Sequence, residues 1–114
     1  MSRDFQEAEK GNTMTVNELK EKLDKKEAIE ILDVRERDEF KFSNIGGTHI
    51  PLSEFAQRYQ ELAPEKNWAV LCHHGMRSAQ AVAFLRNQGF KNVQNISGGI
   101  EAWSVQIDSK IPRY

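Results

Sequence analysis

Three short apolar segments, separated by stretches with helical spacing, constrain the fold of this chain more than any other feature. They are residues 28–34, 68–72 and 93–96. Each is rich in β-branched or other apolar residues and is too short for a buried helix, which is typical of strands covered on both faces. Strands that alternate with helices form α/β domains. The sequence therefore predicts an α/β fold with a central, mostly parallel sheet.

The stretches around these strands carry signals for helices and turns. Thr15 and Glu18 have the spacing of a capping box, and apolar residues then recur at helical spacing, which predicts a helix over residues 16–24. The other expected elements are helices over residues 53–63 and 78–88, single helical turns within 35–42 and 100–103, and a short edge strand at 49–51.

Length and charge limit the classes of protein to consider. The 114 residues fit one domain, and we expect a flexible N-terminal segment over residues 1–12 and one domain over 13–114. The 16 basic and 17 acidic residues nearly balance, which argues against a nucleic-acid-binding protein. The single cysteine cannot form an internal disulfide, and no apolar run suits a signal sequence or membrane helix. We therefore expect a cytoplasmic monomer without membrane association.

The most informative stretch, residues 70–78, reads Val-Leu-Cys-His-His-Gly-Met-Arg-Ser. Cys72 ends a predicted strand, and a helix is predicted to begin at Ser78. Ligands of α/β sheets bind outside the carboxyl ends of strands, and helix N-termini favour anions. A free thiol has a pKa of about 8.5, which helix N-termini and nearby cations lower to roughly 3.5–7.5. The context favours a thiolate nucleophile at Cys72 over a small buried hydrophobic residue.

The residues after Cys72 form a loop suited to an anion. Arg77 is a permanent cation that can hold an anion through paired N–H groups. Gly75 permits a sharp turn in which successive amides point inward. Cys72 is therefore the candidate catalytic residue. The candidate binding loop consists of His73, His74, Gly75, Met76, Arg77 and Ser78.

This stretch resembles the active-site loop of the rhodanese (thiosulfate sulfurtransferase) family, in which Cys-x-x-Gly-x-Arg-Ser/Thr opens a helix. Its four defining residues are matched position by position. They are Cys72, Gly75, Arg77 and Ser78. Three further segments, residues 31–36, 44–52 and 98–103, are similar to family segments that occur in the same order. Together the similar segments extend over residues 14–106.

The resemblance implies a rhodanese-like fold, with a mostly parallel sheet of about five strands and helices on both faces. It implies a sulfurtransferase that needs no cofactor. The donor would be thiosulfate, a polysulfide or a persulfide. Sulfur would pass through a Cys72 persulfide to cyanide or a thiol, including a protein thiol. Asp33 and Arg35 are candidate supporting residues, and bracing of a loop by hydrogen bonds is their favoured role.

Other functions remain as alternatives. His73 stands where the family often has arginine, which leaves one fixed cation fewer for thiosulfate, a dianion. A Cys-dependent phosphatase or arsenate reductase on the same fold is one alternative, although related phosphatases carry one residue more than the four between Cys72 and Arg77. A sulfur-relay binding module is another. A metal site at Cys72, His73 and His74 is disfavoured because adjacent ligands fit one tetrahedral ion poorly.

Overall fold

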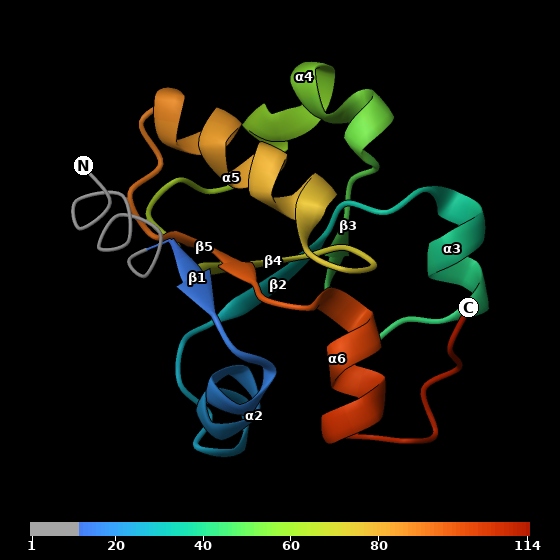
Figure 1. The fold of residues 1–114 in the computed structure, drawn as a ribbon. Helices are drawn as coiled ribbons and strands as arrows, with labels where there is room; N and C mark the ends of the chain where they lie inside the picture. The colour runs from blue at the N-terminus through green and yellow to red at the C-terminus, as the bar shows by residue number, and fades with distance from the viewer. Residues whose placement is uncertain (1–11) are drawn as a thin grey trace, which may run out of the picture.

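A five-stranded, all-parallel sheet forms the centre of the computed structural model, which describes residues 12–114. The strand order is β1-β5-β4-β2-β3, so β4 is the central strand (Figure 1). The strands are β1 (Thr13–Met14), β2 (Glu30–Asp33), β3 (Thr48–His49), β4 (Trp68–Leu71) and β5 (Val93–Ile96). In the register of the sheet, Val70 pairs with Leu32 on one side and with Asn95 on the other. The predicted α/β class and parallel sheet are confirmed.

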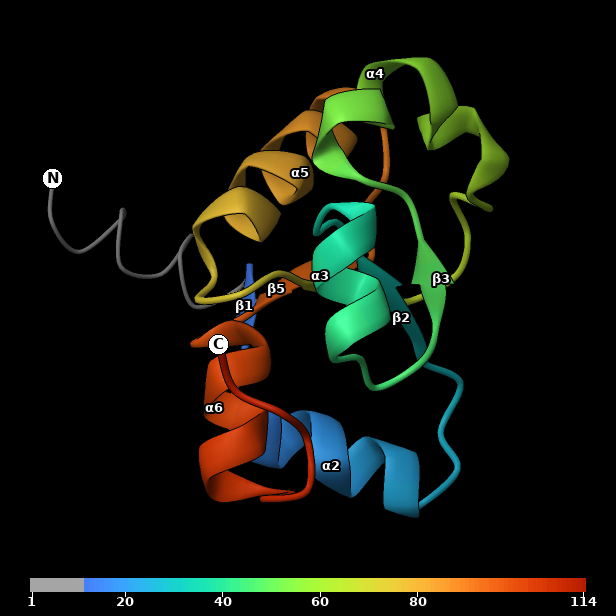
Figure 2. The same cartoon turned by 90° about the vertical axis from the view of Figure 1, so that its right-hand side faces the viewer.

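Helices cover both faces of this sheet (Figures 1 and 2). One face carries α5 (Met76–Asn87) and a group of short helices, η1 (Leu52–Glu54), α4 (Phe55–Arg58) and η2 (Tyr59–Glu61). The other face carries α2 (Val16–Asp24) and α6 (Gly99–Gln106). The short helix α3 (Arg37–Phe42) lies beside the carboxyl ends of the strands.

The alternation of side chains along the strands divides the core into two clusters. Val70 packs with Val82 and Leu85 of α5 on one face, whereas Leu71 packs with Leu19 of α2 and Ile100 of α6 on the other. Successive residues of a strand point to opposite faces, so a strand covered on both sides must be apolar throughout. All four residues of β4 are buried, as a central strand requires.

The sequence predicted the bounds of α2 correctly, whereas several other element boundaries differ from the expectation. The capping box of Thr15 and Glu18 is formed, and α2 has the predicted bounds. The region expected as one helix from Ser53 is broken into three short pieces, and the Ser53 hydroxyl donates to Glu36 instead of capping a helix. Helix α5 begins two residues before Ser78, and α6 extends well beyond one turn.

The N-terminal edge of the sheet was not predicted as a strand. β1 contains only two residues, too few for periodicity to reveal. Just before it, the Asn12 carbonyl accepts a hydrogen bond from the Asn95 N–H at 2.7 Å. The remainder of the segment expected to be flexible, residues 1–11, lies outside the described residues. None of the helices within residues 12–114 combines the length and apolar character needed to span a bilayer.

Candidate functional site

Cys72 lies directly after β4, at the carboxyl edge of the sheet, and its side chain is buried. The Gly75 N–H donates to Cys72 Sγ at 3.1 Å, and Ser78 Oγ lies 3.2 Å from the same sulfur. Gly75 is the N-cap of α5 and has a φ of +109°, in the region that favours glycine. The loop therefore bends back over the sulfur and brings the N-terminus of α5 to it.

Ser78 connects the sulfur to a second polar group. Its hydroxyl lies 2.5 Å from Asn95 Oδ1, and the Asn95 Nδ2 group donates to the Gly75 carbonyl at 2.9 Å. This second bond fixes which end of the amide faces Ser78. Because a hydroxyl has one proton, Ser78 can donate either to Asn95 or to the sulfur at any moment. Ser78 can thus turn its proton toward the sulfur when a negative charge forms there.

The N-terminus of α6 holds the other side of the loop. The Ile100 N–H donates to the Cys72 carbonyl at 2.9 Å, and the Glu101 N–H donates to the His73 carbonyl at 3.1 Å. Gly99 makes this approach possible, because an added Cβ would lie 2.4 Å from both the Cys72 and the His73 carbonyl oxygen. Two hydrogen bonds from one helix end therefore fix the backbone that carries the thiol.

We expect Gly99→Ala to destabilise the protein by about 3 kcal/mol, as strain at a φ of +61° adds to a backbone clash. Urea unfolding followed by circular dichroism measures the effect. Gly46→Ala is the matched control, because Gly46 also has a positive φ but has no atom within 4 Å of an added Cβ. Equal losses in the two variants would show that the close approach at Gly99 has no energetic weight.

Arg77 does not stand as a free cation beside the thiol. Its guanidinium forms a two-bond pair with Glu39 of α3, at 2.6 and 2.8 Å. This bond to Arg77 lowers the pKa of Glu39 from 4.5 to about 2, and the carboxylate raises the pKa of Arg77 in turn. The positive charge expected to serve the loop is thus largely balanced by an acidic side chain from another element.

Asp33, the last residue of β2, and Arg35 form a buried ion pair. Both side chains are fully buried, and Arg35 Nη2 lies 2.7 Å from Asp33 Oδ2. Arg35 also donates to the Ser43 and Glu39 carbonyls at 2.5 and 3.3 Å. Burial opposes its charge, but hydrogen bonds to Asp33 and Tyr114 outweigh this, so the pKa of Arg35 is raised. These contacts hold the Glu39 carbonyl within α3 and the carbonyl of its C-cap residue Ser43, and so fix the element that carries Glu39.

The C-terminal residue Tyr114 packs against the loop. Its ring stacks on His73, with the ring centroids 3.9 Å apart and the planes inclined by 10°. Its hydroxyl lies 2.9 Å from Arg35 Nη1 and donates to Glu39 at 3.0 Å. Burial raises the pKa of Tyr114 and lowers that of His73, so both side chains favour their neutral forms. Tyr114 therefore connects Arg35 and Glu39 to His73 of the loop.

The Glu39 pair should make stability depend on pH. Because the pKa of Glu39 is about 2 in the folded protein and 4.5 ordinarily, its contribution is complete above about pH 5 and disappears as the pH falls toward 2. Glu39→Gln should therefore be less stable than the parent protein near neutrality, and the difference should shrink between pH 4.5 and 2. Urea titrations over this range measure it, with Glu65→Gln at an exposed position as control. A constant difference would contradict the assignment.

The structure brings together most, but not all, of the candidate residues. Cys72, Gly75 and Ser78 meet at the sulfur, while Met76 is 79% exposed and points away from the core. Asp33 and Arg35 bond to each other, and Arg35 bonds to the Ser43 carbonyl after α3 and not to the loop. Glu39, Asn95, Glu101 and Tyr114 were not singled out from the sequence. Only Glu101 lay in a recognised segment, 98–103, and each of the four reaches the site through contacts between distant parts of the chain.

Comparison with known proteins agrees with this fold. The model of the rhodanese-like domain matches residues 15–106. A Bacillus subtilis protein, YrkF, named as a candidate sulfur carrier, is 38% identical over 92 residues, which are 80% of this chain and 50% of YrkF. Another, YtwF, named as a candidate sulfurtransferase, is 34% identical over 93 residues, 81% of this chain and 89% of YtwF.

The fold is also shared with solved structures of rhodanese-related proteins. The crystal structure of a rhodanese-related protein from Thermoplasma volcanium has a TM-score of 0.77 and 36% identity, and the match covers 84% of this chain and 93% of that one. The chain spans half or less of the length of the first curated relatives that it matches. The family match nevertheless includes β2, β4, the loop after Cys72 and α6. The chain therefore belongs to the rhodanese-like domain family.

Proposed function

We propose that this protein is a sulfurtransferase that carries sulfur as a persulfide on Cys72. The observation that carries the proposal is the position of Cys72 Sγ, at the carboxyl end of the central strand and inside a loop that closes on the N-terminus of α5. The relatives named for sulfur transfer or sulfur carriage support the same chemistry at the level of the family.

The reaction has two displacement steps. In the first, the Cys72 thiolate attacks the outer sulfur of a donor. A new S–S bond forms, the donor's S–S bond breaks, and the electron pair leaves with the remainder of the donor. In the second, an acceptor thiolate or cyanide attacks the terminal sulfur, and the Cys72 thiolate leaves. Two displacements at one nucleophile give ping-pong kinetics.

The loop supplies donors for the terminal sulfur anion of the persulfide. The first N–H groups of a helix have no partner within the helix. Those of Met76, Arg77 and Ser78 open α5 and lie in the loop that bends over the thiol. Hydrogen-bond donors fixed in advance around a developing charge stabilise it without reorganisation. The backbone is therefore assigned the main role in holding the sulfur.

The net charge around the loop indicates which class of sulfur donor the site favours. Glu39 balances Arg77, and His73 favours its neutral form. A dianion such as thiosulfate would meet little net positive charge there. We therefore place persulfides of small thiols or proteins, whose sulfur group carries a single charge, ahead of thiosulfate as donors. The same pairing disfavours a phosphatase, which would need the Arg77 guanidinium for the phosphate.

Intact mass measurement tests the proposal. After incubation with polysulfide or glutathione persulfide, the protein should gain about 32 Da, one sulfur atom, and dithiothreitol should remove it. Thiosulfate at equal concentration should load the protein more slowly. Failure of every donor to add sulfur, or hydrolysis of an aryl phosphate instead, would contradict the proposed function.

A further inference from the structure

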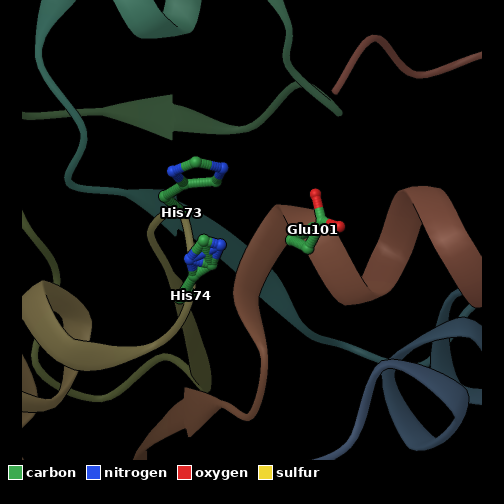
Figure 3. Close-up of side chains that lie close together, drawn as sticks. All are labelled: His73, His74 and Glu101. Carbon is green, nitrogen blue, oxygen red and sulfur yellow. The ribbon is translucent and has the colours of Figure 1, made fainter. Parts of the chain in front are cut away.

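Three side chains that commonly bind transition metals meet beside the sulfur loop. They are His73 and His74, which follow Cys72, and Glu101 of α6. One ligand atom from each lies within 4.8 Å of the other two. Figure 3 shows the two imidazole rings one above the other, on the side of the loop that faces the helix carrying Glu101. Two different elements of the fold thus supply the cluster.

His73 is held in place and has an unused ligand atom. Its ring lies between those of Tyr114 and His74, each with its centroid 3.9 Å away. Its Nε2 atom is buried, and no group within residues 12–114 hydrogen-bonds to it. A buried polar atom without a partner carries a free-energy cost that packing alone does not explain. A ligand at Nε2 would remove this cost.

His74 and Glu101 can supply the other two ligands of a metal site. The Oε2 atom of Glu101 accepts hydrogen bonds from Arg113 Nε at 3.0 Å and from Arg113 Nη2 at 2.5 Å. Both bonds use Oε2, so Oε1 is available for an ion. His74 is exposed, so its ring can turn about its side-chain bonds toward the same point. Two histidines and one glutamate form a recurrent three-ligand set for Zn²⁺, with a fourth position open to water or another ligand.

We propose that His73, His74 and Glu101 form a binding site for a divalent transition metal, with Zn²⁺ as the preferred ion. Two imidazoles favour Zn²⁺, Co²⁺ or Ni²⁺ over Mg²⁺ and Ca²⁺, which take oxygen ligands. In the sequence, a metal site at Cys72, His73 and His74 is disfavoured because three adjacent ligands fit one tetrahedral ion poorly. In the fold, Cys72 Sγ instead receives hydrogen bonds from the loop, and Glu101 comes from a different helix.

Binding is measured directly, so its outcome is separate from that of the proposed function. Untagged protein is titrated with ZnCl₂ by calorimetry, and with Co²⁺ by absorption spectroscopy. We expect one ion per chain, bound at least roughly tenfold more weakly by His74→Ala and by Glu101→Gln. Glu61→Gln is the matched control, because Glu61 is also a carboxylate paired with an arginine, Arg58, and should leave the affinity unchanged.

Cys72→Ser separates this site from metal binding by the thiol. It should keep its affinity for Zn²⁺, and Co²⁺ should give no thiolate charge-transfer band in either protein. Loss of binding in Cys72→Ser, or an unchanged affinity in Glu101→Gln, would overturn the proposal. Circular dichroism spectra of all variants show whether each is folded, and His74→Ala changes an exposed side chain that the core does not need.

Discussion

Replacing Cys72 with serine should lower the rate of sulfur transfer at least about a thousandfold, the scale of loss seen when a catalytic nucleophile is removed. A serine hydroxyl cannot form the persulfide and is far less ionised than a thiol at neutral pH. The exchange is small in volume, and the oxygen can still accept the Gly75 N–H. The thermal unfolding midpoint should therefore stay close to that of the parent protein.

The measurement combines a transfer assay with cyanide as acceptor and the intact mass after loading with polysulfide. Ser78→Ala is the matched control, since it removes a hydroxyl that touches the same sulfur and leaves the nucleophile. It should still gain one sulfur, although more slowly. If Cys72→Ser transfers sulfur within tenfold of the parent rate, the persulfide mechanism is wrong.

Local signals explain why much of the fold was predictable. The capping box at Thr15 and Glu18 and the apolar spacing after it depend only on neighbouring residues, and α2 has the predicted bounds. β5 also matches its apolar segment. Gly75 was recognised as a turn residue, and it takes the left-handed conformation that the loop needs. For Cys72, the strand before it and the helix after it were sufficient to place it at the carboxyl edge of the sheet.

The features that were missed depend on contacts between distant residues. Glu39 and Tyr114 are unremarkable in sequence, yet the first balances Arg77 and the second stacks on His73. Arg77 was expected in the loop but lies in the first turn of α5, and its partner Glu39 could not be deduced without the position of α3. The helix was predicted to begin at Ser78, whereas α5 begins at Met76. In the fold, Gly75 supplies the N-cap through its backbone conformation.

Arg35→Met should be the most destabilising change among the charged residues considered, at about 3–5 kcal/mol. The side chain of Arg35 is fully buried, and it satisfies the Asp33 carboxylate and the Ser43 carbonyl. Methionine fills a similar volume but leaves a buried charge without its partner. A domain of this size has a stability of about 5–15 kcal/mol, so the variant could lose a large share of it. Urea unfolding at neutral pH gives the value.

Arg37→Met provides the matched control for this change. Arg37 is also paired with a carboxylate, Glu54, but its side chain is 64% exposed, and exposed ion pairs contribute little to stability. The comparison holds the substitution constant and varies the burial of the pair. Losses of similar size in the two variants would contradict the bracing role assigned to Arg35.

The double variant Asp33→Asn/Arg35→Met identifies the source of the loss. If the cost of Arg35→Met comes from stranding the Asp33 charge, then a neutral asparagine at position 33 should recover part of it, and the double variant should be more stable than Arg35→Met alone. If the cost comes instead from lost packing or lost bonds to the Ser43 carbonyl, asparagine should recover none. The expected recovery follows from the full burial of both partners, because a lone carboxylate there has no access to water.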